Sequence, residues 1–292
     1  MTSNCREIDC LAVLLTVYNR RESTLACLRT LFAQSEVEQL ELAVYLVDDG
    51  STDGTQEAVA GEFPMVRLLS GDGTLFWSGG MRRAFGAALE KGYPAYLWLN
   101  DDTILKADAL RTILDAHQWV CKEHSGAGVI VGSTLCPDSG EHTYGGVVRT
   151  GRLRRLGFRL VTPSHQPIRC HTFNGNVVLV PDSIARRVGS ISPEFTHGFS
   201  DRDYGLRAEK LGFKCWVAPG YVGHCGRNPP ARWTDSSMPF GERWSLFTSP
   251  KGLPPREWAT YARRHGGPLW PIDAVLPIIR VAIPGLWKWL KR

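Results

Sequence analysis

Short apolar runs alternate with amphipathic segments along the first hundred residues, and this alternation constrains the fold more than any other feature. Residues 11–17 form a continuous apolar run, and the following segment places Leu25, Leu28 and Leu31 at helical spacing. Strands that are apolar throughout and separated by helices indicate a parallel sheet covered on both faces. The pattern predicts strands over 11–17, 42–47, 65–69 and 95–99, and helices over 21–34, 51–60 and 78–90.

The second half of the chain is less regular. Short glycine-rich strands are expected over 129–132, 145–148 and 176–180, and a helix over 201–211. This pattern predicts an α/β fold with a mixed, mainly parallel sheet. Prolines and tryptophans become frequent beyond residue 219, so we expect one domain over 1–240 and a basic, helical C-terminal tail over 241–292.

Charge and cysteine content exclude several classes of protein. The balance of 34 basic against 29 acidic residues is too even to argue for nucleic acid as a partner. Arg6, Glu7 and Asp9 interrupt the first apolar stretch, so no secretory signal is expected. The eight cysteines show no CxxC pair and are expected to be thiols of a cytoplasmic protein.

Polar side chains follow each predicted strand of the first half. In parallel sheets ligands bind beyond the carboxyl ends of the strands, so these residues form the candidate site. The segments are Thr16-Val17-Tyr18-Asn19-Arg20, Asp48-Asp49-Gly50-Ser51, Gly71-Asp72-Gly73 and Asn100-Asp101-Asp102-Thr103.

Two of these segments carry paired acids. Asn100-Asp101-Asp102 has the oxygen ligands that Mg²⁺ or Mn²⁺ prefers, although a turn or helix cap also accounts for it. Asp48 and Asp49 can accept hydrogen bonds from a nucleobase imide or a ribose, and the serine and threonine that follow can cap a helix.

The segment Trp77-Ser78-Gly79-Gly80-Met81-Arg82 opens a predicted helix with small residues beside a basic one. Small residues at a helix N-terminus suit a close approach by phosphate. GxGxxG and P-loop patterns are both absent from the chain, so a dinucleotide cofactor or an NTPase is not expected.

Together these motifs resemble those of the family 2 glycosyltransferases of the GT-A fold, in particular their rhamnosyltransferase-like branch. The resemblance covers roughly residues 10–225 and implies inverting, metal-dependent transfer from a nucleotide sugar. It is carried by Thr16-Val17-Tyr18-Asn19-Arg20, Val47-Asp48-Asp49-Gly50-Ser51-Thr52-Asp53, Asn100-Asp101-Asp102, Phe173-Asn174-Gly175-Asn176 and Asp201-Arg202-Asp203-Tyr204-Gly205-Leu206-Arg207.

The resemblance also implies roles for individual residues. Asp201 would be the catalytic base, with Asp203 as a second candidate, and Asp102 would bind the metal. His224 is similar to the histidine that completes the metal site in some GT-A enzymes. The residues expected to bind the nucleotide sugar, from the resemblance and the motifs together, are Thr16, Tyr18, Asn19, Asp48, Asp49, Trp77, Gly79, Gly80, Arg82, Asp101, Asn174 and Asn176.

The chain departs from the family pattern at two points. The DxD motif begins with Asn100, a weaker ligand than an acid, and Ser200 stands where the family has the first acid of a Glu-Asp pair. Both departures leave the last acid, Asp102 or Asp201, in place. A charged helix start is the alternative explanation for Asp201 and Asp203.

The tail over residues 268–292 combines tryptophans with basic residues, including Trp270, Trp287, Lys288 and Trp289. This composition suits a bilayer interface, and a segment packed on the protein or in a homodimer contact is the alternative. A membrane role agrees with a lipid-linked oligosaccharide or glycan acceptor in surface polysaccharide synthesis, such as that of lipopolysaccharide, at the inner face of the plasma membrane. The leading donor is dTDP-rhamnose, and a UDP-sugar or a non-catalytic binding module are the alternatives.

Overall fold

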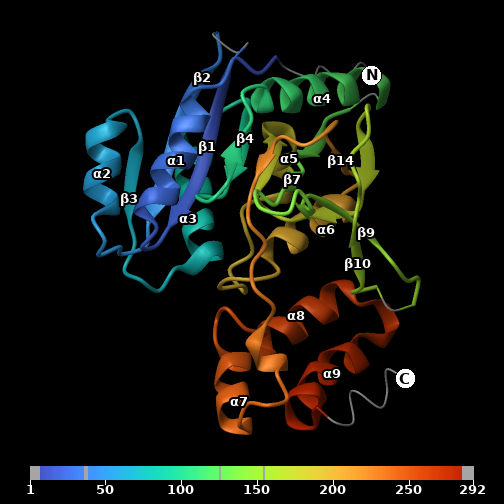
Figure 1. Cartoon of the computed structure of the whole chain (residues 1–292). Coiled ribbons are helices and arrows are strands. Elements are labelled where there is room, and N and C mark those ends of the chain that lie inside the picture. The colour runs from blue at the N-terminus through green and yellow to red at the C-terminus, as the bar shows by residue number, and fades with distance from the viewer. Residues whose placement is uncertain (1–6, 36–38, 125, 154, 285–292) are drawn as a thin grey trace.

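The computed structural model of the chain describes residues 7–35, 39–124, 126–153 and 155–284 (Figure 1). Its centre is an eight-stranded sheet in the order β11-β14-β6-β13-β4-β1-β2-β3. The pairs β1·β2, β2·β3, β1·β4 and β6·β14 are parallel, whereas β13 runs antiparallel to β4 and β6, and β11 antiparallel to β14. The expected mixed, mainly parallel sheet is therefore confirmed.

The first half of the chain supplies the parallel side of this sheet and most of the helices that cover it. Its elements are β1 (Cys10–Val17), α1 (Arg21–Phe32), β2 (Glu41–Asp48), α2 (Thr55–Glu62), β3 (Arg67–Ser70), α3 (Phe76–Lys91), β4 (Ala95–Leu99), β5 (Ile104–Leu105) and α4 (Ala109–His124).

The second half completes the large sheet and adds two small sheets, β10-β9-β12 and β5-β15-β7-β8. Its elements are β6 (Gly128–Val131), β7 (Thr134–Leu135), β8 (His142–Tyr144), β9 (Gly146–Arg149), β10 (Phe158–Leu160), β11 (Ile168–Cys170), β12 (Thr172–Phe173), β13 (Val177–Pro181), α5 (Asp182–Val188), α6 (Ser200–Lys210), β14 (Lys214–Val217) and β15 (Gly223–His224).

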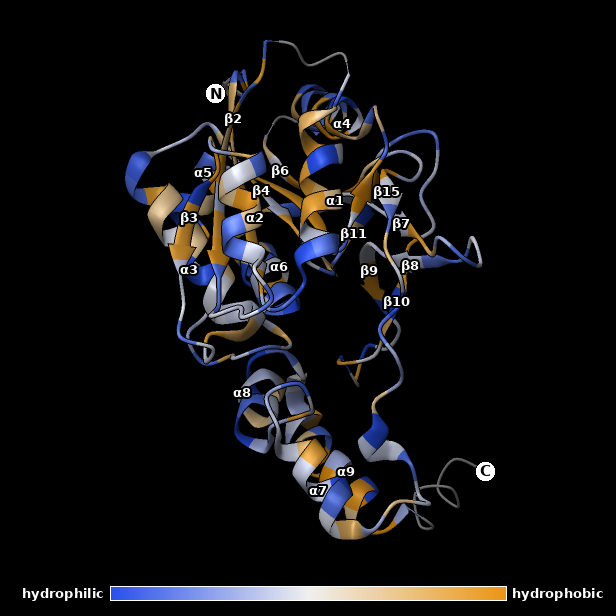
Figure 2. Cartoon of the chain, turned by 60° about the vertical axis from the view of Figure 1, so that its left-hand side comes forward, coloured by the Kyte–Doolittle hydropathy of each residue, from blue (hydrophilic) through white to orange (hydrophobic). Residues whose placement is uncertain are grey.

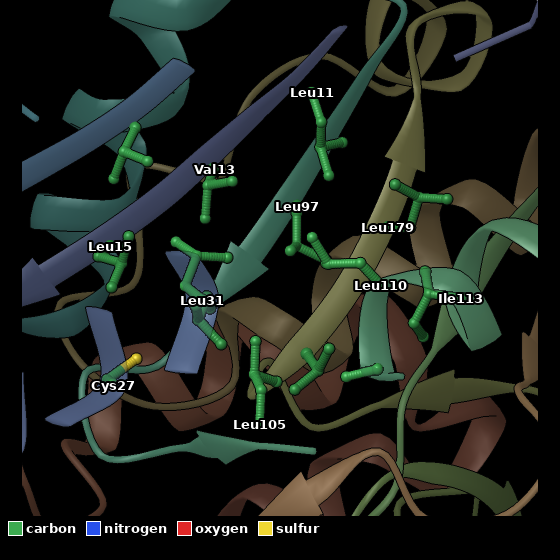
Figure 3. Close-up of a cluster of buried hydrophobic side chains, with 14 of the residues drawn as sticks. Leu11, Val13, Leu15, Cys27, Leu31, Leu97, Leu105, Leu110, Ile113 and Leu179 are labelled. Carbon is green, nitrogen blue, oxygen red and sulfur yellow. The ribbon is translucent and has the colours of Figure 1, made fainter. Parts of the chain in front are cut away.

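Helices cover both faces of the large sheet because successive residues of each buried strand face opposite sides. Leu11, Val13 and Leu15 of β1 belong to one apolar cluster with Leu31 of α1 and Leu110 of α4 (Figure 3). The alternate β1 residues face a second cluster, formed with α3, α5 and α6. The sheet is thus the middle of three layers.

The C-terminal part is helical, as expected, and lies to one side of the sheet. Figure 1 shows α8 between the sheet and the helices α7 and α9, and in Figure 2 apolar residues colour much of α9. Within the described ranges no helix is long and apolar enough to cross a membrane. The elements are η1 (Arg232–Thr234), α7 (Phe240–Thr248), α8 (Pro255–His265), η2 (Gly267–Leu269) and α9 (Trp270–Ala282).

The start of α2 and the state of Cys121 differ from what the sequence predicts. The helix expected from residue 51 begins at Thr55, because the Asp53 carboxylate accepts a hydrogen bond from the Thr55 N–H and the preceding residues form a turn. Cys121 is disulfide-bonded, so the expectation of thiols throughout is wrong there. The tail residues Trp287, Lys288, Trp289, Lys291 and Arg292 lie outside the described residues.

Candidate active site

The loops after β1 and β2 are joined by Asn19, which has a positive φ of 51°. Its side-chain oxygen accepts a hydrogen bond from the Thr52 N–H at 2.7 Å, and its own N–H donates to the Ser51 hydroxyl at 2.8 Å. Tyr18, next to it, is 51% exposed. Asn19 therefore organises the loops, and the exposed Tyr18 ring is free to stack on a base.

Asp48 is the last residue of β2 and Asp49 follows it, but their carboxylates have different surroundings. The Asp49 carboxylate accepts hydrogen bonds from the Gly73, Leu75 and Phe76 N–H groups at 3.0, 3.2 and 2.8 Å. Asp48 accepts one bond, from Ser51, and its buried Oδ2 has no partner among the described residues. Asp49 thus fixes the loop before α3, and Asp48 keeps an acceptor for a ligand.

Asp49→Asn is expected to lower the free energy of unfolding by about 1–3 kcal/mol, because its amide group turns a donor toward buried N–H donors. Urea denaturation measures the change. The exposed Asp72 accepts bonds only within its own turn, so Asp72→Asn should stay within about 0.5 kcal/mol of the parent. Equal effects of the two substitutions would contradict the loop-fixing role.

We name Asn100-Asp101-Asp102, which follows β4, the metal motif after its expected role. It is paired with an arginine from the loop after β1. Arg20 Nη1 lies 3.1 Å from Asp101 Oδ1 and 2.9 Å from Asp102 Oδ2. Burial raises the pKa of Asp101 to about 7, although the nearby Arg20 opposes this. Arg20 ends the segment Thr16-Val17-Tyr18-Asn19-Arg20 but is not among the expected site residues. Its guanidinium group joins the loops after β1 and β4 electrostatically.

The donor chemistry at Asp102 fits a divalent cation. The Asp102 side chain is 26% exposed, and Asp101 Oδ2 is buried with no partner within the described part of the chain. Mg²⁺ commonly takes one or two carboxylates and completes its coordination with substrate phosphates and water. No group of three or more His, Cys, Asp or Glu side chains among the described residues could hold a metal unaided. A cation held by Asp102 would therefore need further ligands from outside the described residues.

Cys225 is the nearest contact of Asp102 from the C-terminal side of the site. Its Sγ lies 3.4 Å from Asp102 Oδ1 and also accepts the Asn176 side-chain N–H at 3.4 Å. Cys225 follows His224, the last residue of β15, and contacts Asp102 directly. The expected role of His224 as a metal ligand stays a prediction.

The glycines that open α3 have a packing role. A side chain at Gly80 would overlap the Thr16 hydroxyl of β1, because its Cβ would lie only 2.0 Å from that oxygen. Gly79 is buried next to Leu75, and Arg82 donates a hydrogen bond to the Ser192 carbonyl at 3.3 Å. At Gly80 helix α3 thus approaches strand β1 closely. The expected contact of this segment with phosphate stays a prediction.

Trp77 connects the metal motif to the expected base. Its indole N–H donates to Asn100 Oδ1 at 2.8 Å. Its ring lies against Gly175, where a Cβ would come within 2.8 Å of the ring and 3.3 Å of the Asp201 Cβ. The Gly175 N–H donates to Asp201 Oδ2 at 3.1 Å.

The carboxylate of Asp201, the expected base, accepts two backbone N–H groups. Its Oδ1 accepts the Arg202 N–H at 2.7 Å, and its side chain is half-buried at the start of α6. Burial raises the pKa of this carboxyl above its ordinary value, while Arg202 and the two N–H bonds oppose the rise. A raised pKa brings a carboxylate closer to the range in which it takes a proton efficiently at neutral pH.

Asp203, the second expected base, is enclosed. Its side chain is 0% exposed and contacts Arg207 at 2.8 Å, Arg264 at 3.3 Å and His265 at 2.8 Å. Burial alone raises its pKa, but the hydrogen bonds from His265 and Arg207 outweigh burial and hold the pKa below its ordinary value. The Asp203 carboxylate is thus saturated by partners within the protein, and its role as a second candidate base stays a prediction.

The segment before β13 also contributes to the site. The Asn174 N–H donates to the Gly145 carbonyl at 3.0 Å, and the Asn176 carbonyl accepts the Asn100 N–H at 3.0 Å. Asn176 is buried, whereas Asn174 is partly exposed. The structure thus brings this segment together with the metal motif.

Two solved structures are similar in fold. A mannosyltransferase, PcManGT from Pyrobaculum calidifontis in complex with GDP-Man and Mn²⁺, has a TM-score of 0.55 and 16% identity, covering 98% of this chain and 73% of that chain. TarS residues 1–349 from S. aureus, in complex with UDP-GlcNAc, has a TM-score of 0.55 and 13% identity, covering 87% and 67%. No curated protein sequence matches the chain.

The model of the family described as glycosyl transferase family 2 matches residues 12–176, which is more than half of the chain. The matched segment contains most of β1, all of β2, β4 and α3 with Trp77, and the loops that carry Asp49 and Asp102. The chain therefore belongs to glycosyl transferase family 2 and is a glycosyltransferase of the GT-A fold.

Proposed function

We propose that this glycosyltransferase moves a sugar from a nucleoside diphosphate to an acceptor hydroxyl with inversion at the anomeric carbon. The observation that carries the proposal is the position of Trp77. This side chain hydrogen-bonds Asn100 of the metal motif and packs over Gly175, whose N–H holds Asp201. The cation-binding and proton-accepting groups are thus linked through one side chain.

In the proposed reaction the oxygen of the acceptor hydroxyl forms a bond to the anomeric carbon, and Asp201 takes the proton of that hydroxyl. The bond between that carbon and the diphosphate breaks on the opposite face, so the configuration inverts. Asp102 would hold Mn²⁺ or Mg²⁺, which when bound neutralises charge on the leaving diphosphate. Tyr18 would stack on the base, and Asp48 would accept a hydrogen bond from the base or the ribose.

The leading donor is dTDP-rhamnose, on the resemblance of the motifs to the rhamnosyltransferase-like branch, and a UDP-sugar is the alternative. Thymine and uracil present the same imide to an acceptor such as Asp48 Oδ2. Competition separates the two donors: dTDP should inhibit transfer at lower concentration than UDP.

Proton NMR of the product should show the anomeric configuration opposite to that of the donor, and retention would contradict the role of Asp201.

A non-catalytic sugar-nucleotide-binding module is the second candidate, and one observation favours it. Arg20 already provides a cation to Asp101 and Asp102, and Asn100 replaces the first acid of the motif. Such a module would bind nucleotide equally well in EDTA and release none from any donor. Mn²⁺-dependent turnover excludes it.

We further propose that the C-terminal helices bring the enzyme to the inner membrane surface, where a lipid-linked oligosaccharide would be the acceptor. Phe240 and Trp244 of α7 are 52% and 37% exposed, and Ile272 and Val275 of α9 are 53% and 50% exposed. The chain continues beyond residue 284 with tryptophans and basic residues. Apolar and aromatic side chains beside cations favour an anionic lipid interface.

Replacing Trp244 and Ile272 together by serine is expected to weaken binding to phosphatidylglycerol vesicles roughly tenfold, because less apolar area enters the interface. Co-sedimentation measures the bound fraction. Met65 is 59% exposed, but it precedes β3 in the first half of the chain, so Met65→Ser provides the matched control. Equal vesicle binding by the wild type, the double variant and Met65→Ser would contradict the membrane proposal. So would the absence of vesicle binding by the wild type.

A further inference from the structure

Helix α8 packs one face against the loop that leads to the candidate base. We name residues 192–199, which precede α6 and Asp201, the base loop. The contacting α8 residues recur at the spacing of one helical face. They are Glu257, Trp258, Tyr261 and Arg264, and His265 on the same face contacts Asp203 of α6.

Glu257 binds the middle of the base loop through Thr196. Its two carboxylate oxygens accept hydrogen bonds from the Thr196 N–H at 3.1 Å and the Thr196 hydroxyl at 2.8 Å. The Thr196 carbonyl accepts the Ser78 N–H at 3.1 Å from α3. Ser78 and Ser200 also share a hydrogen bond of 2.7 Å between their buried hydroxyls. The base loop is thus held between α8 and the helix that carries Trp77.

The residue just before α6, Phe199, has a positive φ of 68°, which is unfavourable for a residue with a bulky side chain. Such conformations persist where surrounding contacts impose them. The Phe199 ring is stacked on Tyr261 with centroids 5.2 Å apart and lies 5.4 Å from Trp258. Two aromatic side chains of α8 thus support the backbone turn that starts α6.

Asp203 ties α8 to α6 two residues after the base. His265 Nε2 lies 2.8 Å from Asp203 Oδ1, and Arg264 reaches the same oxygen at 3.3 Å and the Ser192 hydroxyl at 2.7 Å. These partners come from outside α6, whereas Arg207 lies on α6 itself. The buried contacts fix the first turn of α6, on which Asp201 lies.

We propose that α8 positions the catalytic base, with Glu257 acting through Thr196 and His265 acting through Asp203 as positioning residues. This proposal rests on the proposed role of Asp201 in transfer. It makes α8 a part of the catalytic domain, although the helix lies beyond the boundary expected near residue 240. Small displacements of a reacting group are costly, since about 1 Å can reduce rate 10²-fold.

The test compares three variants in the full-length chain: Glu257→Ala, Glu257→Gln and, on the exposed side of α8, Arg263→Ala. Glu257→Ala is expected to lower kcat about 10–100-fold, with the donor KM within about twofold of the wild type. Glutamine still accepts the Thr196 N–H, so Glu257→Gln should restore kcat to within about threefold of the wild type. Circular dichroism at the assay temperature establishes that each variant is folded.

Hydrogen exchange of the amides over 195–203 gives a second measurement that needs no turnover. Faster exchange in Glu257→Ala and His265→Ala, but not in Arg263→Ala, would support the positioning of residues 195–203 by α8. This result would hold even if the wild type transfers no sugar and the proposed function fails. Wild-type kcat in folded Glu257→Ala, or equal losses in Glu257→Ala and Arg263→Ala, would overturn the proposal while leaving the function intact. Unchanged exchange in Glu257→Ala and His265→Ala would overturn it as well.

Discussion

Asp201→Asn is expected to lower kcat for sugar transfer by about 10²–10⁴-fold, with the donor KM within about twofold of the wild type. Asparagine can still accept the Gly175 N–H hydrogen bond but cannot take a proton from the acceptor. Because burial raises the pKa of Asp201, kcat/KM of the wild type should rise with pH as this carboxyl ionises and then level off. Steady-state kinetics with saturating acceptor measures both effects.

Asp203→Asn is the matched control, since the two aspartates lie on the same turn of α6. Removing the charge of the fully buried Asp203 takes the carboxylate partner from the partly buried Arg207 and leaves Arg264 with Glu194, so this variant should lose about 3–5 kcal/mol of folding free energy. Asp201→Asn should lose less, about 1–3 kcal/mol, because its amide group can accept only one of the two backbone N–H groups, but no cationic side chain is hydrogen-bonded to its carboxylate in the described structure. Full activity of Asp201→Asn would assign the proton transfer to another group.

Asp102→Ala is expected to abolish the dependence of turnover on Mn²⁺ and to lower kcat/KM about 10³-fold. Stabilisation of the leaving diphosphate by a cation is worth several kcal/mol, and each 1.36 kcal/mol corresponds to a factor of ten. Asp101 cannot replace Asp102, because it is 7% exposed and its Oδ1 is bound to Arg20. A Mn²⁺ titration of nucleotide release measures the loss.

Cys225→Ser provides the control for Asp102→Ala. Serine keeps a donor near Asp102 Oδ1, where the thiol contacts it at 3.4 Å, and it leaves the carboxylate in place. Its turnover should stay within about threefold of the wild type. An unchanged Mn²⁺ dependence in Asp102→Ala would move the metal site away from this motif.

The sequence predicts the strands of the sheet centre well and the peripheral elements poorly. Strand β4 has the predicted bounds because all of its residues are apolar and buried on both faces. Strands β5, β7 and β15 are each two residues long, and β15 pairs with β5 and β7, which lie far away in the sequence. Such pairing leaves no local periodicity in the sequence.

The sequence also locates the site at the carboxyl ends of the strands, but it does not distinguish free side chains from saturated ones. Asp48 and Asp49 look alike in the sequence, and only the fold shows that loop N–H groups occupy Asp49. The same holds for Asp203, whose partners include Arg264 and His265, about sixty residues further along the chain. A charge pattern read along α6 does not reveal partners supplied by another helix.

Nucleotide release from a panel of dTDP- and UDP-sugars, with Mn²⁺ or EDTA and with lipid-linked and glycan acceptors, tests whether the protein is a metal-dependent transferase. We expect Mn²⁺-dependent release from one donor by the wild type and its loss in Asp102→Ala. Tight nucleotide binding without release from any donor, whichever acceptor is supplied, would contradict this expectation and favour a sugar-nucleotide-binding module.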